Sequence, residues 1–117
     1  MLSFTLPVPP PANNAYINLK RGGRAKSKSH KAWIKNADGF YMLQHLGRHP
    51  KIEVPFYCKM IFPHNMHGDL DGRIKLILDW LWKRDLTCDD RYCSKLETER
   101  CPDTGESLVW VLVQPAE

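Results

Sequence analysis

The sequence predicts an α/β (α+β) domain in which a mixed sheet of about four strands is covered by two helices, in the order βαβαββ. Two observations indicate this class. Short apolar stretches between proline- and glycine-rich breaks are typical of strands, and two longer stretches repeat their apolar residues at helical spacing. The chain has 117 residues, 43% of them hydrophobic, with no repeat or linker. We therefore expect one domain over residues 1–117.

The first half of the chain predicts a strand, a loop and a helix. Residues 3–6 form the expected strand, which stops at a run of prolines, and Asn13-Asn14 marks a turn. Residues 18–28 have no hydrophobic period and are expected to form a mobile loop. Ser29 is expected to cap a helix that runs to about residue 46. Its expected buried side holds Trp33, Ala37, Phe40, Tyr41 and Leu43 or Leu46.

The second half predicts a strand, a helix and two further strands. Residues 52–62 form the expected strand, and Pro55 suggests an edge position. The helix begins at Asp69 or Asp71 and ends near residue 84. Its expected apolar face holds Ile74, Leu78 and Leu81 or Trp82, with Ile77 and Trp80 flanking it. Residues 91–99 and 108–113 are expected to pair as a hairpin, with the turn around residues 103–105.

Composition excludes a membrane-spanning protein. The longest apolar runs fall far short of the roughly 20 residues that cross a bilayer, and the N-terminal stretch does not resemble a signal peptide. We therefore expect a cytoplasmic protein. The four cysteines form no CxxC pair and are expected to be reduced packing residues, although a metal site of Cys88, Cys93 and a histidine stays open. The cysteines are Cys58, Cys88, Cys93 and Cys101.

Charge is unevenly distributed along the chain. The net charge is +4, and no acidic residue precedes Asp38. A basic arm lies in that first part, and acidic residues gather between Asp69 and Asp90. This pattern suits a polyanion bound beside a metal ion, and the alternative is a solvated basic loop next to a charged helix. The expected DNA-binding residues of the arm are Lys20, Arg21, Arg24, Lys26 and Lys28.

Asp69-Leu70-Asp71 is the strongest local signal for chemistry. Two carboxylates one residue apart at the start of a helix can turn toward one point, and Mg²⁺ prefers such oxygen ligands. Lys75 lies one helical turn after Asp71, where an ammonium group could stabilise charge on a phosphate. Asp79 follows on the same face and is expected to pair with Lys75 or support the ligands. The alternative is a helix cap followed by a surface ion pair.

Asp89-Asp90 is a second pair of carboxylates. Asp90 can complete the metal site if the chain returns along the second helix, or if it reaches the site of a partner subunit. Asp89 is expected to support it. His64 and His67 lie near the first acidic pair and are candidates for a base or a phosphate contact.

Taken together, these segments resemble the RusA family of Holliday-junction resolvases, small nucleases of bacteria and their prophages. The resemblance covers most of the chain. It rests on the order and spacing of the following pieces: Leu6-Pro7 with Pro9-Pro10, Asn13-Asn14-Ala15-Tyr16, Ser27 with Trp33, Asp69-Leu70-Asp71 with Lys75 and Asp79, and Asp89-Asp90. It departs from the family at Gly72, where an asparagine is usual, and in the loop of residues 62–68, which lacks arginine.

The resemblance implies a function and a set of functional residues. It implies a homodimer that binds a four-way DNA junction and resolves it by paired, symmetric, Mg²⁺-dependent nicks during recombination and repair. The metal ligands would be Asp69, Asp71 and Asp90, and the functional lysine would be Lys75. Two alternatives remain: a prophage remnant that binds junctions without cutting them, and a nuclease for other branched DNA.

Overall fold

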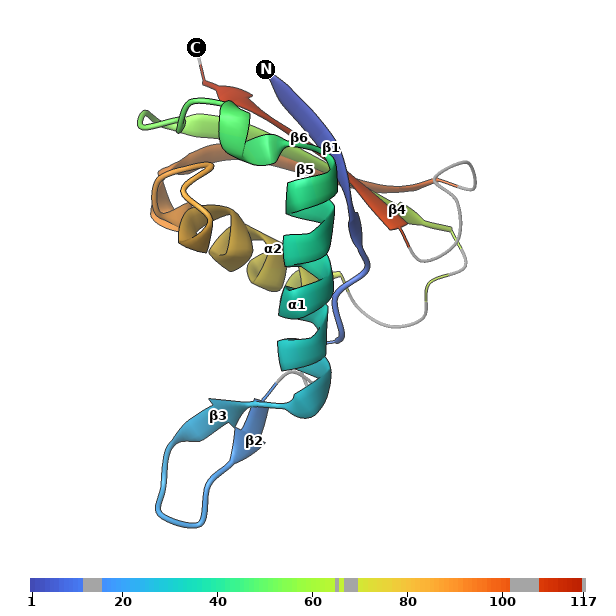
Figure 1. Cartoon of the computed structure of the whole chain (residues 1–117), viewed down its shortest axis with the longest axis vertical. Coiled ribbons are helices and arrows are strands. Elements are labelled where there is room, and N and C mark those ends of the chain that lie inside the picture. The colour runs from blue at the N-terminus through green and yellow to red at the C-terminus, as the bar shows by residue number, and fades with distance from the viewer. Residues whose placement is uncertain (12–15, 65, 67–69, 102–107, 117) are drawn as a thin grey trace.

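Figure 1 shows the computed structural model of the chain, which describes residues 1–11, 16–64, 66, 70–101 and 108–116. A mixed four-stranded sheet and two helices make up the domain, which confirms the predicted fold class. The helices are α1 (Lys28–Leu43) and α2 (Asp71–Lys83). In spatial order, the strands of the sheet are β1 (Leu2–Pro7), β6 (Leu108–Pro115), β4 (Phe56–Pro63) and β5 (Cys93–Cys101).

Pairing in the sheet differs from the expectation for the last two strands. β6 pairs in antiparallel fashion with both β1 and β4, whereas β5 pairs with the other side of β4 and runs parallel to it. The predicted hairpin of the last two strands is therefore wrong, because β4 lies between them. The expected turn at residues 103–105 lies outside the described residues, as does the turn expected at residues 13–14.

One face of the sheet carries the core. Side chains alternate along the strands, so every second residue of β1, β4 and β6 is buried against the helices. These buried residues are Leu2, Phe4, Leu6, Phe56, Cys58, Met60, Phe62, Val109, Val111 and Val113. Apart from Pro63 at the end of β4, the alternate positions, among them Tyr57, Lys59 and Trp110, are partly or fully exposed. A sheet with a single buried face therefore has both helices on that face.

The central position of β4 contradicts the edge position suggested by Pro55. The strand begins one residue after this proline, so the missing backbone N–H of Pro55 lies outside the ladder. β4 can therefore pair on both sides from Phe56 onward.

α1 begins slightly earlier than the sequence predicted. Its N-cap is Ser27, not Ser29, and the Ser27 hydroxyl accepts a hydrogen bond from the backbone N–H of His30. Trp33 and Ala37 are buried as expected, but Leu43 is exposed at the last turn. A short 3-10 helix, η2 (Leu46–Arg48), follows and buries Leu46.

Residues 18–28 are not the unstructured loop that the sequence suggested. β2 (Tyr16–Asn18) and β3 (Arg24–Lys26) pair as a separate antiparallel hairpin. Gly22 and Gly23 both have positive φ in its turn, a conformation that glycine adopts without strain. The hairpin projects from the N-terminal end of α1, away from the sheet (Figure 1).

The buried face of α2 agrees in part with the expected one. Leu78 and Leu81 are buried as expected, and so are the flanking residues Ile77 and Trp80. Ile74, in contrast, is half-buried, and Trp82 is 42% exposed. Arg73 occupies a buried position on the same face, one turn before Ile77. Among the helices that the structure describes, none combines the length and the apolar character needed to cross a lipid bilayer.

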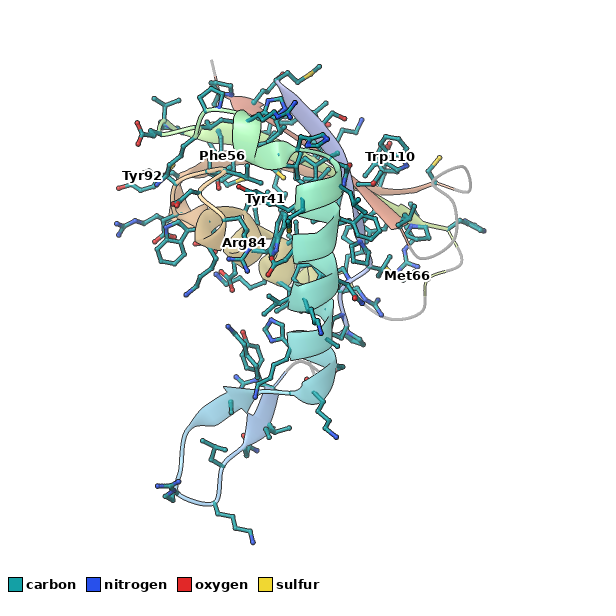
Figure 2. The ribbon with its side chains drawn as sticks, in the orientation of Figure 1. Tyr41, Phe56, Met66, Arg84, Tyr92 and Trp110 are labelled. Carbon is teal, nitrogen blue, oxygen red and sulfur yellow. The ribbon has the colours of Figure 1, made fainter. Side chains whose placement is uncertain are left out.

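A polar bridge joins the two helices. The Asp38 carboxylate on α1 accepts hydrogen bonds from Arg84 Nε and Nη2, each at 2.5 Å, and from Trp80 Nε1 at 3.0 Å. Figure 2 shows Arg84 and Tyr41 in the space between α1 and α2. The Tyr41 ring meets the Trp80 ring edge to face, with centroids 6.2 Å apart. The bridge therefore holds α2 at a defined position along α1.

Candidate functional site

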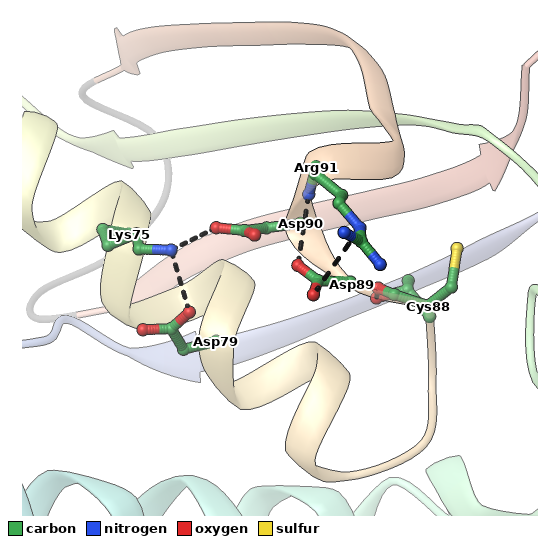
Figure 3. Close-up of polar contacts among 7 residues, drawn as sticks. Lys75, Asp79, Cys88, Asp89, Asp90 and Arg91 are labelled. Carbon is green, nitrogen blue, oxygen red and sulfur yellow. Dashed lines mark hydrogen bonds and ion pairs between the residues drawn. The ribbon is translucent and has the colours of Figure 1, made fainter.

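Lys75 lies at the centre of a charged cluster on the outer side of α2 (Figure 3). Its ammonium group donates a hydrogen bond to Asp90 Oδ2 and lies 3.2 Å from Asp79 Oδ1. The second contact is the ion pair that the i,i+4 spacing predicted. Lys75 thus joins a carboxylate of its own helix to one from a different element.

The path of the chain after α2 brings Asp90 to Lys75, although 15 residue positions separate them. Asp85 adopts a positive φ of 57° and turns the chain just beyond the helix. Thr87 then forms a parallel bridge with Ile52, and a short 3-10 helix, η3 (Asp90–Tyr92), follows. η3 packs against α2 before the chain enters β5.

Asp89 fixes the start of this short helix. Its carboxylate accepts a hydrogen bond from the backbone N–H of Arg91 and lies 4.0 Å from the Arg91 guanidinium. Asp89 is thus the N-cap of η3, which orients the following carboxylate of Asp90. The two neighbouring aspartates have different contacts: Asp89 bonds its own short helix, and Asp90 bonds α2.

The contact between Lys75 and Asp90 favours the charged form of both side chains. The hydrogen bond from Lys75 lowers the pKa of Asp90 below its usual value despite partial burial. The same bond to Asp90 raises the pKa of Lys75, and Asp79 adds to the effect. At neutral pH Lys75 is therefore an ammonium group, and Asp90 is a carboxylate that retains acceptor capacity.

The structure describes two of the three expected metal ligands, Asp71 and Asp90. Asp71 is the first residue of α2 and is exposed, one turn before Lys75 on the same side of the helix. Asp69 lies outside the described residues. Within the described ranges, no three histidine, cysteine, aspartate or glutamate side chains form a metal-binding group.

The chemistry of the available donors nevertheless fits Mg²⁺. Asp71 and Asp90 offer the hard carboxylate oxygens that this ion prefers, and it is usually held by one or two carboxylates together with phosphate. The Asp90 carboxylate is already oriented toward a cation, because it binds the Lys75 ammonium group.

The basic arm is the β2–β3 hairpin together with the start of α1. The side chains of Lys20, Arg21, Arg24, Lys26 and Lys28 are all exposed. The Arg24 guanidinium lies 4.8 Å from the centre of the Tyr16 ring, a cation–π contact. None of the five forms an ion pair with a carboxylate in the part of the chain that the structure describes.

Sequence reasoning missed the role of Arg73. This buried residue donates a hydrogen bond from Nε to the Pro9 carbonyl at 3.0 Å, which ties the segment after β1 to the first turn of α2. Trp33 Nε1 likewise donates to the Pro7 carbonyl at 2.8 Å. The available signal was a charged residue at a core position of the helical repeat.

The other candidate residues lie outside this cluster. His64 is exposed, and its backbone N–H bonds to the Cys101 carbonyl at the end of β5. His67 lies outside the described residues. Cys58 is fully buried in the core, and Cys88, Cys93 and Cys101 are half-buried.

Comparisons with known proteins add no relative. No protein-family model matches the chain, and no curated protein sequence matches it. The likeness to the RusA resolvases therefore rests on the motifs of the sequence, and function must be argued from the site.

Proposed function

We propose that this protein is a Mg²⁺-dependent endonuclease that cuts four-way DNA junctions. The observation that supports the proposal is the contact of Lys75 with Asp90, which brings a carboxylate from η3 to a lysine that lies one helical turn after Asp71. The sequence had left open whether Asp90 could approach α2 within one chain. Carboxylates that hold a metal ion, together with a lysine beside them, form a suitable set of groups for phosphodiester hydrolysis.

Each residue has a distinct part in this proposal. Asp69, Asp71 and Asp90 would hold the metal, which when bound polarises the phosphate and activates water. Lys75 would exchange its bond to Asp90 for one to a phosphate oxygen and stabilise the charge that develops during cleavage. Asp79 would keep the ammonium group beside the phosphate, and Asp89 would keep Asp90 oriented through the cap of η3.

The β2–β3 hairpin would bind the DNA backbone. It is a basic projection beside a domain whose acidic cluster lies on α2, so its lysines and arginines can reach phosphates beyond the cleavage position. Their exposure and lack of ion pairs within the described chain leave them available for phosphate oxygens.

Paired nicks require two active sites. A homodimer with two-fold symmetry presents two identical clusters to a junction that is itself nearly two-fold symmetric. Sedimentation of the protein alone and with a four-way junction tests this part. We expect two protein chains for each junction. A single chain for each junction would refute the proposed dimer but would not by itself refute the proposed cleavage activity.

Cleavage itself is tested with a labelled synthetic four-way junction and a linear duplex of the same sequence, each incubated with and without Mg²⁺. We expect nicks in the junction only, and only with the metal. Asp71→Asn and Asp90→Asn should abolish cleavage while junction binding is retained. Asp85→Asn is the matched control, because Asp85 is an exposed aspartate just beyond α2 that contacts Lys51.

The two alternatives give different results in this assay. Tight junction binding without cleavage at any Mg²⁺ concentration would identify a protein that binds junctions but does not cut them. Faster cleavage of a flap or three-way substrate would identify a nuclease for other branched DNA. Full cleavage activity of Asp71→Asn would refute the metal site and would show that Asp71 serves only as a charged residue at the start of α2.

A further inference from the structure

A cavity of about 380 Å³ lies in the corner between the β2–β3 hairpin, α1 and α2. Tyr16 and Lys26 of the hairpin line it together with positions 76, 79, 80 and 83 of α2. Residues 30, 33 and 34 of α1 complete this part of the lining. Both helices thus contribute side chains at helical spacing from a single face. The volume falls in the range of small-ligand pockets, roughly 300–1,000 Å³.

Aromatic rings dominate the lining. The Tyr16 and His30 rings meet edge to face, with centroids 5.1 Å apart. The indole N–H groups of Trp33 and Trp80 are already bonded within the protein, to the Pro7 carbonyl and to Asp38. These two residues therefore contribute carbon surface to the cavity. Trp82 is 42% exposed, so its ring is accessible from solvent.

Cations surround these rings. Lys26 and Lys83 form no ion pair with any described carboxylate, and the Lys83 ammonium lies 5.7 Å from the centre of the Trp82 ring. Arg84 lines the cavity while held by Asp38. The lining has one carboxylate, Asp79, whose charge is offset by Lys75. The cavity therefore favours an anionic ligand with an aromatic part.

We propose that this cavity binds one unpaired nucleotide of a DNA strand. The base would stack on Trp82 and beside the Tyr16–His30 pair, and the phosphate would lie near Lys26 and Lys83. A nucleobase supplies the flat aromatic surface and its phosphate the negative charge, so one ligand satisfies both features of the lining.

The position of the cavity connects it to the charged cluster. Asp79 lines the cavity and also pairs with Lys75, so a nucleotide bound here lies beside the residues proposed to cut DNA. Branch points can supply unpaired nucleotides, and binding one would position the strand relative to Asp71 and Asp90. The inference rests on the proposed function for its ligand, DNA, but it concerns binding and needs no cleavage.

The test uses Trp82→Ala with Trp110→Ala as a matched control. The two tryptophans are almost equally exposed, at 42% and 45%, but Trp110 lies on the open face of the sheet, away from the cavity. Binding of a short, labelled oligothymidylate is measured without Mg²⁺ by fluorescence anisotropy. We expect Trp82→Ala to weaken binding roughly tenfold and Trp110→Ala to leave it unchanged. Trp82→Phe should restore most of the affinity, because it keeps an aromatic ring.

Further measurements distinguish a bound DNA strand from a free nucleotide and from a second copy of the chain. Lys83→Ala should lower the slope of log affinity against log salt by about one, as expected for one lost phosphate contact. Equal loss in the two tryptophan variants, or none in Trp82→Ala, would overturn the proposal. The proposal would also be overturned if a mononucleotide competes for the site as strongly as the oligothymidylate does, because that result indicates a pocket for free nucleotides. Loss of self-association in Trp82→Ala, with strand binding unchanged, would assign the cavity to a second copy of the chain.

The outcome can be separated from that of the proposed function. A protein that cuts no junction can still bind the oligothymidylate through Trp82, which would support this inference alone. If Trp82→Ala cuts junctions and binds the single strand as well as the unaltered protein does, the proposed nuclease activity stands. The proposal that the cavity binds a nucleotide would then be refuted. Circular dichroism of each variant checks that the fold is retained.

Discussion

The bridge between Asp38 and Arg84 offers a quantitative test of how the two helices are held together. Asp38→Asn keeps the shape of the side chain and removes its charge. The new amide can still accept a hydrogen bond through one oxygen, but its nitrogen cannot accept the bond from Arg84 Nη2. The bond from Arg84 Nε also loses the carboxylate charge that strengthens it.

The expected loss of stability follows from the exposure of the pair. Hydrogen bonds to charged groups contribute about 1.5–3 kcal/mol when well buried. The two side chains are 37% and 33% exposed, so solvent screening lowers the contribution. We therefore expect the free energy of unfolding to fall by about 1–2 kcal/mol. In a domain of this size that corresponds to a melting temperature roughly 4–8 °C lower.

Asp85→Asn is the control for this change. Asp85 lies 3.6 Å from Lys51, but its side chain is 82% exposed, so the loss should be no more than a few tenths of a kcal/mol. Urea unfolding at neutral pH, followed by tryptophan fluorescence, measures both variants. Equal stability of Asp38→Asn and Asp85→Asn would refute the reasoning that the bridge holds α1 and α2 together.

The same bridge predicts a dependence on pH. Burial opposes ionisation of Asp38, but hydrogen bonds from Arg84 and Trp80 outweigh it and keep the pKa of this carboxyl below its usual value. A lowered pKa contributes stability above the ordinary value of about 3.9, and the contribution is lost as pH falls through the folded-state pKa. The stability difference between the unaltered chain and Asp38→Asn should therefore narrow below about pH 4, and a constant difference would contradict the assignment.

Three further predictions concern separate parts of the molecule. Replacing both Lys20 and Arg21 with alanine should reduce the slope of log junction affinity against log salt by about two, because each cation is expected to contact one phosphate. An unchanged slope would show that the hairpin tip does not bind DNA. Burial raises the pKa of the Cys58 thiol to about 12, so iodoacetamide at pH 8 should label Cys88 well before Cys58 in the folded protein, as peptide mass spectrometry can show. Gln44→Ala removes the side-chain hydrogen bonds to the edge strand β1 and should lower the free energy of unfolding, measured in urea, by about 1–2 kcal/mol. A change within experimental error would show that water replaces these hydrogen bonds.

The sequence by itself determined the local structure of this protein. Periodicity identified both helices and all four strands of the main sheet, because the spacing of apolar residues sets which face of an element is buried. The Lys75–Asp79 ion pair was also predictable, since residues four apart on a helix always lie close together. Even so, local patterns placed the cap of α1 at Ser29, whereas Ser27 provides it.

Only the tertiary structure decided how the elements are arranged. The last two strands are neighbours along the chain, yet β4 lies between them, because strand pairing depends on the whole set of buried faces and not on sequence separation. In the same way, the contact between Lys75 and Asp90 depends on where η3 packs against α2, and the cavity depends on where the β2–β3 hairpin stands relative to both helices. These distances are set by the packing of elements far apart in the chain, which no local spacing records.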